Sequence, residues 1–278
     1  MYRACVCQMT SRRVHRSGLS GHTLLELAIA VALGLVVTAG AISLYGSQRA
    51  AFARASDAAH IHEAGMTALM LMGLQLQMAG FIPADMQQAN LSAALFGCSG
   101  GRPTGADDNL ACETLTSRSD GIAIRYVGDN VSTWPTGTGQ STDCLGQGVA
   151  KLAVDAPGVV LVNRFYAKPS TSTGEPELYC EGSGNTSSSQ PLVEGVERIR
   201  LRYWLANSTS ALEASAIAPA QWKRVVAVDL CVLVRGAPAA RPRVYVDCDG
   251  VSAQGADTRA RQAFWRHVAL RNAGEGGT

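Results

Sequence analysis

The chain of 278 residues has few charges, since only 17% of its residues are Asp, Glu, Lys or Arg, and only 6% are aromatic. About a quarter of the residues are charged in a typical globular domain. With 47% hydrophobic residues the chain can still build a large core, which excludes disorder along its whole length. The 24 basic and 22 acidic residues give no broad cationic field, so nucleic-acid binding is not expected.

Acidic residues are absent from residues 1–21, which contain Arg3, Arg12, Arg13 and Arg16. Without this segment the net charge changes from +2 to −2, because 20 basic and 22 acidic residues remain. A basic, acid-free N-terminus in front of an apolar stretch is typical of an export signal. We therefore interpret residues 1–21 as a processing segment that contributes nothing to the fold.

Formal charge is also absent from Leu27 to Gln48, a run of 22 residues. As a helix this run is ~33 Å long, enough to cross a bilayer core of about 30 Å. The arginines before it favour the cytoplasmic side, which sends the C-terminal bulk across the membrane. The pattern predicts a single N-terminal membrane span, with the N-terminus inside and the C-terminal bulk outside.

Glu26 stands at the edge of this hydrophobic run. A carboxylate inside a membrane-embedded helix costs on the order of 2–3 kcal/mol unless it is paired or lies near the interface. Two interpretations stay open from the residue alone: Glu26 lies at the level of the lipid headgroups, or it meets a cationic partner.

The segment Gly21-His22-Thr23-Leu24-Leu25-Glu26-Leu27 resembles the class III signal of type IV prepilins. The resemblance implies that prepilin peptidase cuts after Gly21, that the new N-terminal residue His22 is methylated, and that the hydrophobic helix is retained. Most family members have Phe at the position of His22. Glu26 becomes the fifth mature residue, and the resemblance implies that it compensates the N-terminal amine of a neighbouring subunit during assembly.

Three further segments resemble PilW-type minor pilins: Leu74–Phe81, Gln190–Glu197 and Phe264–Asn272. Membership of this group implies a priming or tip role in the type IV pilus, in adhesion, twitching motility or DNA uptake. The implied partners are other minor pilins, the major pilin and a large tip adhesin. Pseudopilins of the J type in type II secretion share this layout and are the nearest alternative.

Four regions are expected along the chain: a leader (1–21), a transmembrane helix segment (22–48), the periplasmic half of the same helix (49–80) and a β-rich globular domain (81–278). No strong helix breaker occurs from Thr23 to about Ala79. A helix of this length would span ~85 Å, as in a pilin spine. The alternative is two helices with a break near Gly46.

Beyond Pro83 the sequence changes to short alternating or β-branched runs separated by polar stretches. Ile199, Leu201 and Tyr203 alternate with arginines, which indicates a strand with one buried face. The fold class predicted is therefore α+β and pilin-like, with the long N-terminal helix packed on an antiparallel sheet. The expected strands are 121–127, 159–166, 196–204, 224–234, 243–247 and 264–270, and the expected long loops are 97–109, 128–148 and 168–190.

Cysteines are the strongest sign of the compartment. Cys5 and Cys7 lie in the leader, and six remain: Cys98, Cys112, Cys144, Cys180, Cys231 and Cys248. An even number in an exported domain predicts three disulfides in the periplasm. Six cysteines allow fifteen connectivities, and nearest-neighbour pairing is the one that we favour. A zinc site is disfavoured because no CxxC pair occurs in this part of the chain.

Little in the sequence indicates catalysis or a cofactor, and we expect no enzyme. Gly97-Cys98-Ser99-Gly100-Gly101 formally matches the nucleophile elbow G-x-S-x-G, with Asp247 and His267 following in the hydrolase order. A membrane-anchored periplasmic hydrolase using Ser99 is therefore kept as an alternative. The other remaining alternative is an anchored binding module whose sheet or loops hold a ligand.

Overall fold

The computed structural model describes residues 23–86, 93–129, 132–150, 158–239 and 242–272. The chain divides into two compact units, Met1–Arg54 and Ala55–Thr278. Helix α1 (Leu24–Met78) begins in the first unit and ends in the second.

Helix α1 is a single helical element of 55 residues. It runs without interruption through Gly34, Gly40 and Gly46, so the alternative of a break near Gly46 is wrong. Each glycine costs only about 1 kcal/mol in a helix, and the Ala- and Leu-rich sequence around them favours helix. The predicted end near Ala79 is confirmed to within one residue.

The second unit contains two larger antiparallel sheets and two hairpins. The strand order is β1-β4-β5-β6-β7 in the five-stranded sheet and β12-β9-β8 in the three-stranded sheet, and the hairpins are β2-β3 and β10-β11. The strands are β1 (Leu95–Cys98), β2 (Gly101–Ala106), β3 (Asn109–Thr114), β4 (Gly121–Gly128), β5 (Val159–Pro169), β6 (Pro176–Gly182), β7 (Ser189–Glu194), β8 (Val196–Leu205), β9 (Val225–Pro238), β10 (Val244–Val246), β11 (Ser252–Gln254) and β12 (Arg259–Ala269). Short 3-10 helices lie at Ala84–Met86, Ala214–Ala216 and Pro219–Arg224.

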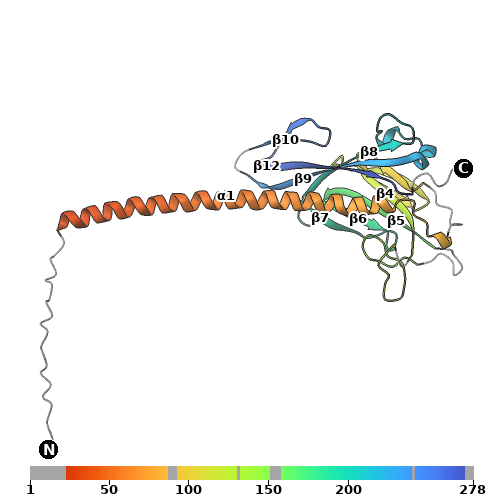
Figure 1. Ribbon diagram of the computed structural model, residues 1–278, viewed down its shortest axis with the longest axis horizontal. Coiled ribbons are helices and arrows are strands. Elements are labelled where there is room, and N and C mark those ends of the chain that lie inside the picture. Colours follow the sequence, from red (N-terminus) through yellow and green to blue (C-terminus); the bar gives the residue numbers. More distant parts are fainter. Residues whose placement is uncertain (1–22, 87–92, 130–131, 151–157, 240–241, 273–278) are drawn as a thin grey trace, which may run out of the picture. The chain divides into compact units, whose positions relative to one another are not determined.

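The core lies between the second half of α1 and the two sheets, as Figure 1 shows. The buried residues of α1 repeat at helical spacing and therefore form one face: Ile61, Gly65, Ala68, Leu69, Met72, Gly73 and Leu76. Polar contacts also lie in this core, where the amide of the fully buried Asn163 donates to Gln75 Oε1 at 2.8 Å and to the hydroxyl of Tyr126 at 3.3 Å. The predicted α+β class, with a long helix on antiparallel sheets, is confirmed.

Two of the three predicted loops contain strands. Strand β2 and the start of β3 fall in 97–109, whereas β6 and the first residues of β7 fall in 168–190. The sequence Pro-Glu-Leu-Tyr-Cys-Glu-Gly of β6 has little alternation, because both faces of this strand are covered and six of its seven residues are buried. These two loop predictions were wrong because Gly, Pro and Ser were weighed above pairing partners that only the tertiary structure supplies.

Three disulfides form, Cys98–Cys112, Cys144–Cys180 and Cys231–Cys248, and these are the pairs that nearest-neighbour pairing gives. The first joins β1 to β3 and holds the hairpin 101–114, here called the first arm. The third joins β9 to the turn of the hairpin 244–254, here called the second arm. The second ties the loop between β4 and β5 to β6.

An ionic network joins the ends of β9 and β12 to the turn between β5 and β6. Glu175 accepts from Arg235 at 3.0 Å and from Arg259 at 2.8 Å. Arg261 donates to both oxygens of Glu197 (2.6 and 3.1 Å) and of Asp257 (2.6 and 3.1 Å). The hydrogen bonds from Arg261 lower the pKa of Asp257 to about 2.

The close packing of α1 on β12 predicts that Gly65 tolerates no side chain. A Cβ at Gly65 would overlap the ring of Phe264, with Cγ only 2.7 Å away, whereas a Cβ at Gly46 meets nothing within 4 Å. We expect Gly65→Ala to lower the stability by about 1–3 kcal/mol through overpacking, despite its gain in helix propensity. Thermal unfolding of the detergent-solubilised chain measures this, with Gly46→Ala as the matched control. Equal midpoints for the two variants would contradict the packing.

The ionic network predicts a dependence of stability on acid pH. Asp257 has a pKa of about 2 in the folded chain against about 3.9 in an unfolded one. Its contribution is therefore complete above pH ~4 and is lost as the pH falls towards 2. We expect Asp257→Asn to be less stable than the wild type at pH 7 and equally stable near pH 2, measured by denaturant unfolding. A difference that does not change with pH would show that the Arg261 pairing does not act on Asp257.

Candidate assembly site

The first turn of α1 is closed by a capping box. The backbone N–H of Glu26 donates to Thr23 Oγ1 at 3.2 Å, and the N–H of Thr23 donates to Glu26 Oε2 at 2.9 Å. Two N–H groups that a helix start leaves unpaired are thereby satisfied, and the carboxylate lies at the positive end of the helix dipole. Glu26 has a structural role within its own chain, in addition to the two roles considered from the sequence.

The first half of α1 is apolar on all sides. Its large hydrophobic side chains from Leu24 to Phe52 are 51% to 87% exposed in the isolated chain. By length and composition this helix is able to cross a membrane, and an 18-residue window within it has a mean hydropathy of 2.4. A helix that is apolar all round is stable only when lipid or protein surrounds it, so this feature is compatible with membrane anchoring.

The expected processing residues Gly21 and His22 lie outside the described residues. Thr23 is the first described residue and the N-cap of α1. Two residues, His22 and Thr23, therefore lie between the expected cleavage position and the first helical residue, Leu24. Cleavage itself stays a prediction.

The end of α1 is held by the last residues of the described chain. The side-chain amide of Asn272 donates to the carbonyls of Ala79 (3.2 Å) and Gln77 (3.5 Å), and Arg266 Nη1 donates to the carbonyl of Leu69 at 3.4 Å. The segments Leu74–Phe81 and Phe264–Asn272, both singled out in the sequence, therefore meet in the structure. Nearer the N-terminus of α1, Asp57 Oδ1 accepts from the N–H of Ala237 at 2.6 Å.

The first arm covers the outer face of the five-stranded sheet and buries two arginines there. Arg164 is fully buried and pairs with Asp107 on the arm and, at 3.5 Å, with Glu181. Arg125 donates to the carbonyls of Asp107 (2.9 Å) and Ala93 (3.0 Å), and burial lowers its pKa. The arm therefore supplies acceptors that compensate the two desolvated cations.

The second arm is attached to the outer face of the three-stranded sheet. Besides the Cys231–Cys248 disulfide, Asp249 pairs with Arg200 at 3.2 Å and with Arg202 at 3.3 Å. Beneath it, Leu233 and Ala263 form a small second core together with Tyr245. Disulfides and arginines thus fix both arms on their sheets.

Buried polar groups also join the two sheets. Asp120, in front of β4, accepts from the N–H groups of Gly100 (2.8 Å) and Leu201 (2.9 Å), and burial raises the pKa of its carboxyl.

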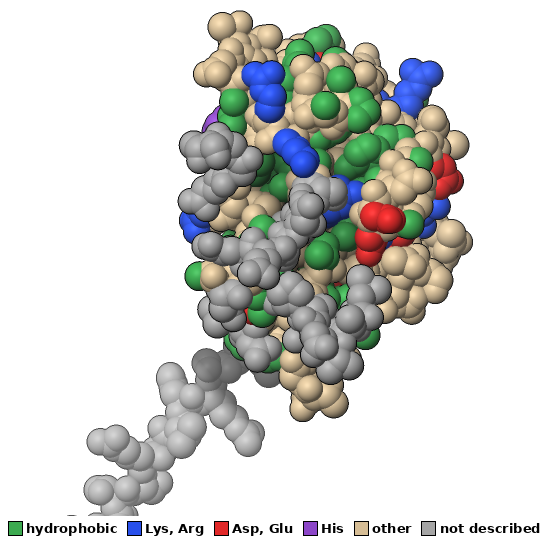
Figure 2. All heavy atoms as spheres, turned by 90° about the vertical axis from the view of Figure 1, so that its right-hand side faces the viewer, with side chains coloured by type: hydrophobic (Ala, Val, Ile, Leu, Met, Phe, Trp, Pro, Cys, Tyr) green, Lys and Arg blue, Asp and Glu red, His purple; other side chains and the backbone are tan. Residues whose placement is uncertain are grey.

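Basic and acidic side chains are interspersed on the face seen in Figure 2, among wide areas of uncharged side chains.

The structure does not support the hydrolase alternative. Ser99 lies in the turn between β1 and β2, so a strand follows it where a nucleophile elbow needs a helix. Its hydroxyl accepts from the N–H of Ser215 at 3.1 Å. Asp247 accepts from two amides of its own turn, while His267 Nδ1 is bonded to Asp229 at 2.6 Å. The three residues thus have separate partners and form no triad.

Metal ligands do not gather among the described residues, where no group of three His, Cys, Asp or Glu side chains is placed to hold an ion. The ring of His62 packs edge-on against Phe264, with ring centroids 5.8 Å apart. Sequence reasoning also missed Thr23 as the N-cap, although the pattern T-x-x-E was there to indicate it. It missed the buried arginines as well, since Arg125 and Arg164 have no distinguishing local pattern.

Comparison with known proteins gives one family. Residues 164–272, which extend from β5 to just beyond β12, match the family model described as type IV pilus-assembly protein W, PilW. Two of the segments that resemble PilW-type proteins, Gln190–Glu197 and Phe264–Asn272, lie within the matched range. No curated protein sequence matches the chain.

Among solved structures, a type IV-like pilin from Thermus thermophilus is similar to this chain, with a TM-score of 0.39 and 11% sequence identity. The similarity covers 75% of this chain and 95% of the other. The resemblance to PilW-type proteins seen in the sequence is confirmed by the family model, which matches residues 164–272 of this chain.

Proposed function

We propose that the protein is a minor pilin of the type IV pilus that acts in priming or at the tip of the filament. Membership of a pilus system implies other pilins as partners. The observation that carries the proposal is an exposed apolar half-helix that begins just after Gly21, has Glu26 in its first turn and has no charge from Leu27 to Gln48. Such a surface needs lipid before assembly and neighbouring helices afterwards.

The proposed sequence of events depends on this helix. Prepilin peptidase removes residues 1–21, residues 22–48 hold the protein in the inner membrane, and residues 49–80 continue into the periplasmic domain. The filament then takes up the helix from the membrane. Among apolar neighbours a carboxylate is strongly favoured to meet a cation, and the N-terminal amine of an adjacent pilin supplies one.

The same helix would serve a J-type pseudopilin of type II secretion. The family model favours the pilus, because its description names pilus assembly. A deletion strain distinguishes the two systems: loss of twitching motility supports the pilus, and loss of protein secretion with normal motility supports the pseudopilin.

The capping box allows the charge of Glu26 to be tested separately from its role in the helix start. Glu26→Gln removes the charge, but Gln still accepts the N–H of Thr23, as in the S/T-x-x-E/Q box. We expect Glu26→Gln to abolish or strongly reduce piliation, measured by electron microscopy and twitching zones, with the protein still in the membrane fraction.

Thr23→Ala is the matched control, since it removes the capping hydroxyl and keeps the charge. Loss of an N-cap costs about 1 kcal/mol, so we expect this variant to assemble pili at near wild-type levels. Normal pili with Glu26→Gln and none with Thr23→Ala would overturn the charge-pairing role and leave capping as the function of Glu26.

A further inference from the structure

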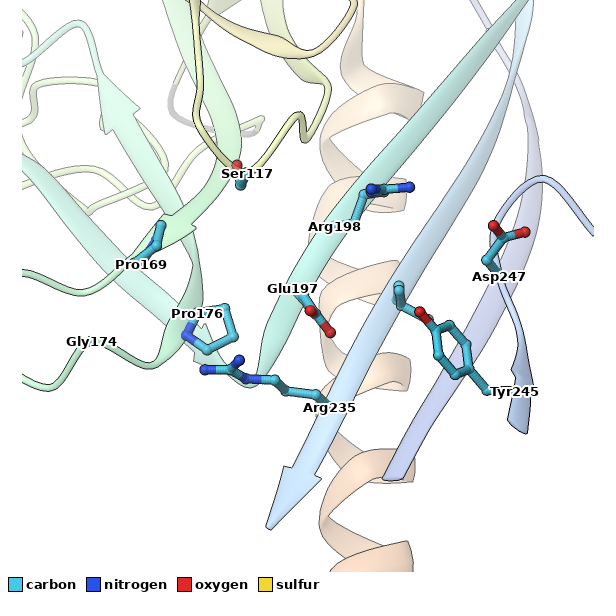
Figure 3. Close-up of a pocket in the computed structure, with 10 residues that line it drawn as sticks. Ser117, Pro169, Gly174, Pro176, Glu197, Arg198, Arg235, Tyr245 and Asp247 are labelled. Carbon is cyan, nitrogen blue, oxygen red and sulfur yellow. The ribbon is translucent and has the colours of Figure 1, made fainter. Parts of the chain in front are cut away.

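The globular unit has a cavity of about 250 Å³ at the edge of the second arm. Figure 3 shows Ser117, Pro169 and Pro176 on one side, Tyr245 and Asp247 on the other, and Glu197 and Arg198 on β8 between them. Pockets for drug-sized ligands occupy roughly 300–1,000 Å³, so this one suits a molecule the size of a single sugar.

Arg198 supplies the unpaired positive charge of the cavity. It is half-buried, and within the described part of the chain its guanidinium makes no hydrogen bond or ion pair. The neighbouring arginines differ, since Arg200 pairs with Glu213 at 2.7 Å and Arg202 with Asp249. A guanidinium carries five N–H donors and stays charged, so Arg198 brings unused donors and a positive charge to the cavity.

Arg235 also lines the cavity, but it adds no free donor. It pairs with Glu175 through Nη2, and its Nε, which has no partner among the described residues, is buried and out of reach of a ligand. Arg198 is therefore the arginine whose donors are available to a ligand.

The acids that line the cavity, Glu197 and Asp247, make no hydrogen bond to Arg198. Both oxygens of Glu197 accept from Arg261, and Asp247 Oδ1 accepts from the N–H groups of Asp249 and Val251, each at 3.0 Å. Asp247 Oδ2 faces no donor among the described residues and is therefore available to a hydroxyl. The unused capacity of the cavity is thus the donors of Arg198 and one acceptor.

The rest of the lining is apolar. Leu233, Pro169, Pro176 and the ring of Tyr245 contribute carbon surface. The ring of Tyr245 is held by the Arg261 guanidinium, 5.6 Å from its centroid. A pyranose presents the matching features, with C–H groups on its faces and hydroxyls around its edge.

We propose that this cavity binds a hexuronate, a sugar that bears a carboxylate, with Arg198 as the partner of the carboxylate. Arginine binds carboxylates through two parallel hydrogen bonds, and the body of the sugar lies against Tyr245 and the prolines. Asp247 Oδ2 accepts from a ring hydroxyl. This ligand site is independent of the assembly role proposed above.

Isothermal titration calorimetry of the full chain in detergent, with galacturonate as the ligand, tests the site. We expect galacturonate to bind, and galactose, which has the same ring without the carboxylate, to bind at least tenfold more weakly. Arg198→Met should weaken galacturonate binding at least tenfold. Arg198→Lys keeps the charge but loses the two parallel N–H donors, so we expect its affinity for galacturonate to lie between those of the wild type and Arg198→Met.

Arg224→Met is the matched control, because Arg224 does not line the cavity and its guanidinium donates to the carbonyl of Ala206 at 3.0 Å; we expect it to bind like the wild type. Thermal midpoints check that each variant is folded, and Arg198→Lys carries the test if Arg198→Met does not fold. The proposal is overturned if the wild type does not bind galacturonate, if galactose binds equally well, if glutamate binds more tightly than galacturonate, or if Arg198→Met binds unchanged.

Discussion

The burial of one face of α1 between two antiparallel sheets is the contact on which the globular unit depends. Ala68, Met72 and Leu76 are fully buried, and Gly65 lets Phe264 of β12 lie directly against the helix. This apolar burial supplies most of the stabilisation, since a fully buried large side chain contributes about 1.5–3 kcal/mol. The hydrogen bonds from Asn163 to Gln75 and from Asn272 to the helix end are weaker and directional, and they define the register of the helix on the sheets.

The two arms close the outer faces that the core leaves open. Each arm has a disulfide and an acidic side chain that pairs with arginine on the sheet below, Asp107 with Arg164 and Asp249 with Arg200. A disulfide stabilises by restricting the unfolded chain, by ~3 kcal/mol for loops of this length. A buried cation destabilises unless acceptors surround it, so the arms and the arginines depend on each other. The unpaired Arg198 differs in this respect, and that difference makes its cavity a candidate ligand site.

How much the sequence predicts depends on the range of the interactions involved. The long helix and the alternating strand β8 follow from local composition and periodicity, and the three disulfides follow from the cysteine number. Strands β2 and β6 were missed because both contain Gly and Pro and lie in stretches rich in Gly, Ser, Thr, Pro and Asn, and only cross-strand pairing makes them strands. The cavity was missed for a similar reason, since Ser117, Arg198 and Tyr245 lie on three separate segments. The capping box is the exception, because its pattern is local and was available.

The start of helix α1 lies next to the proposed cleavage position after Gly21. A capped helix that starts just after Gly21 and has no charge from Leu27 to Gln48 is useful in a filament only if the basic leader is removed and the helix is kept. The intact mass of the protein isolated from membranes measures this directly. We expect a chain that begins at His22, with or without one methyl group. A full-length chain that begins at Met1 in functional pili, or a chain cleaved beyond the helix, would contradict the proposed processing.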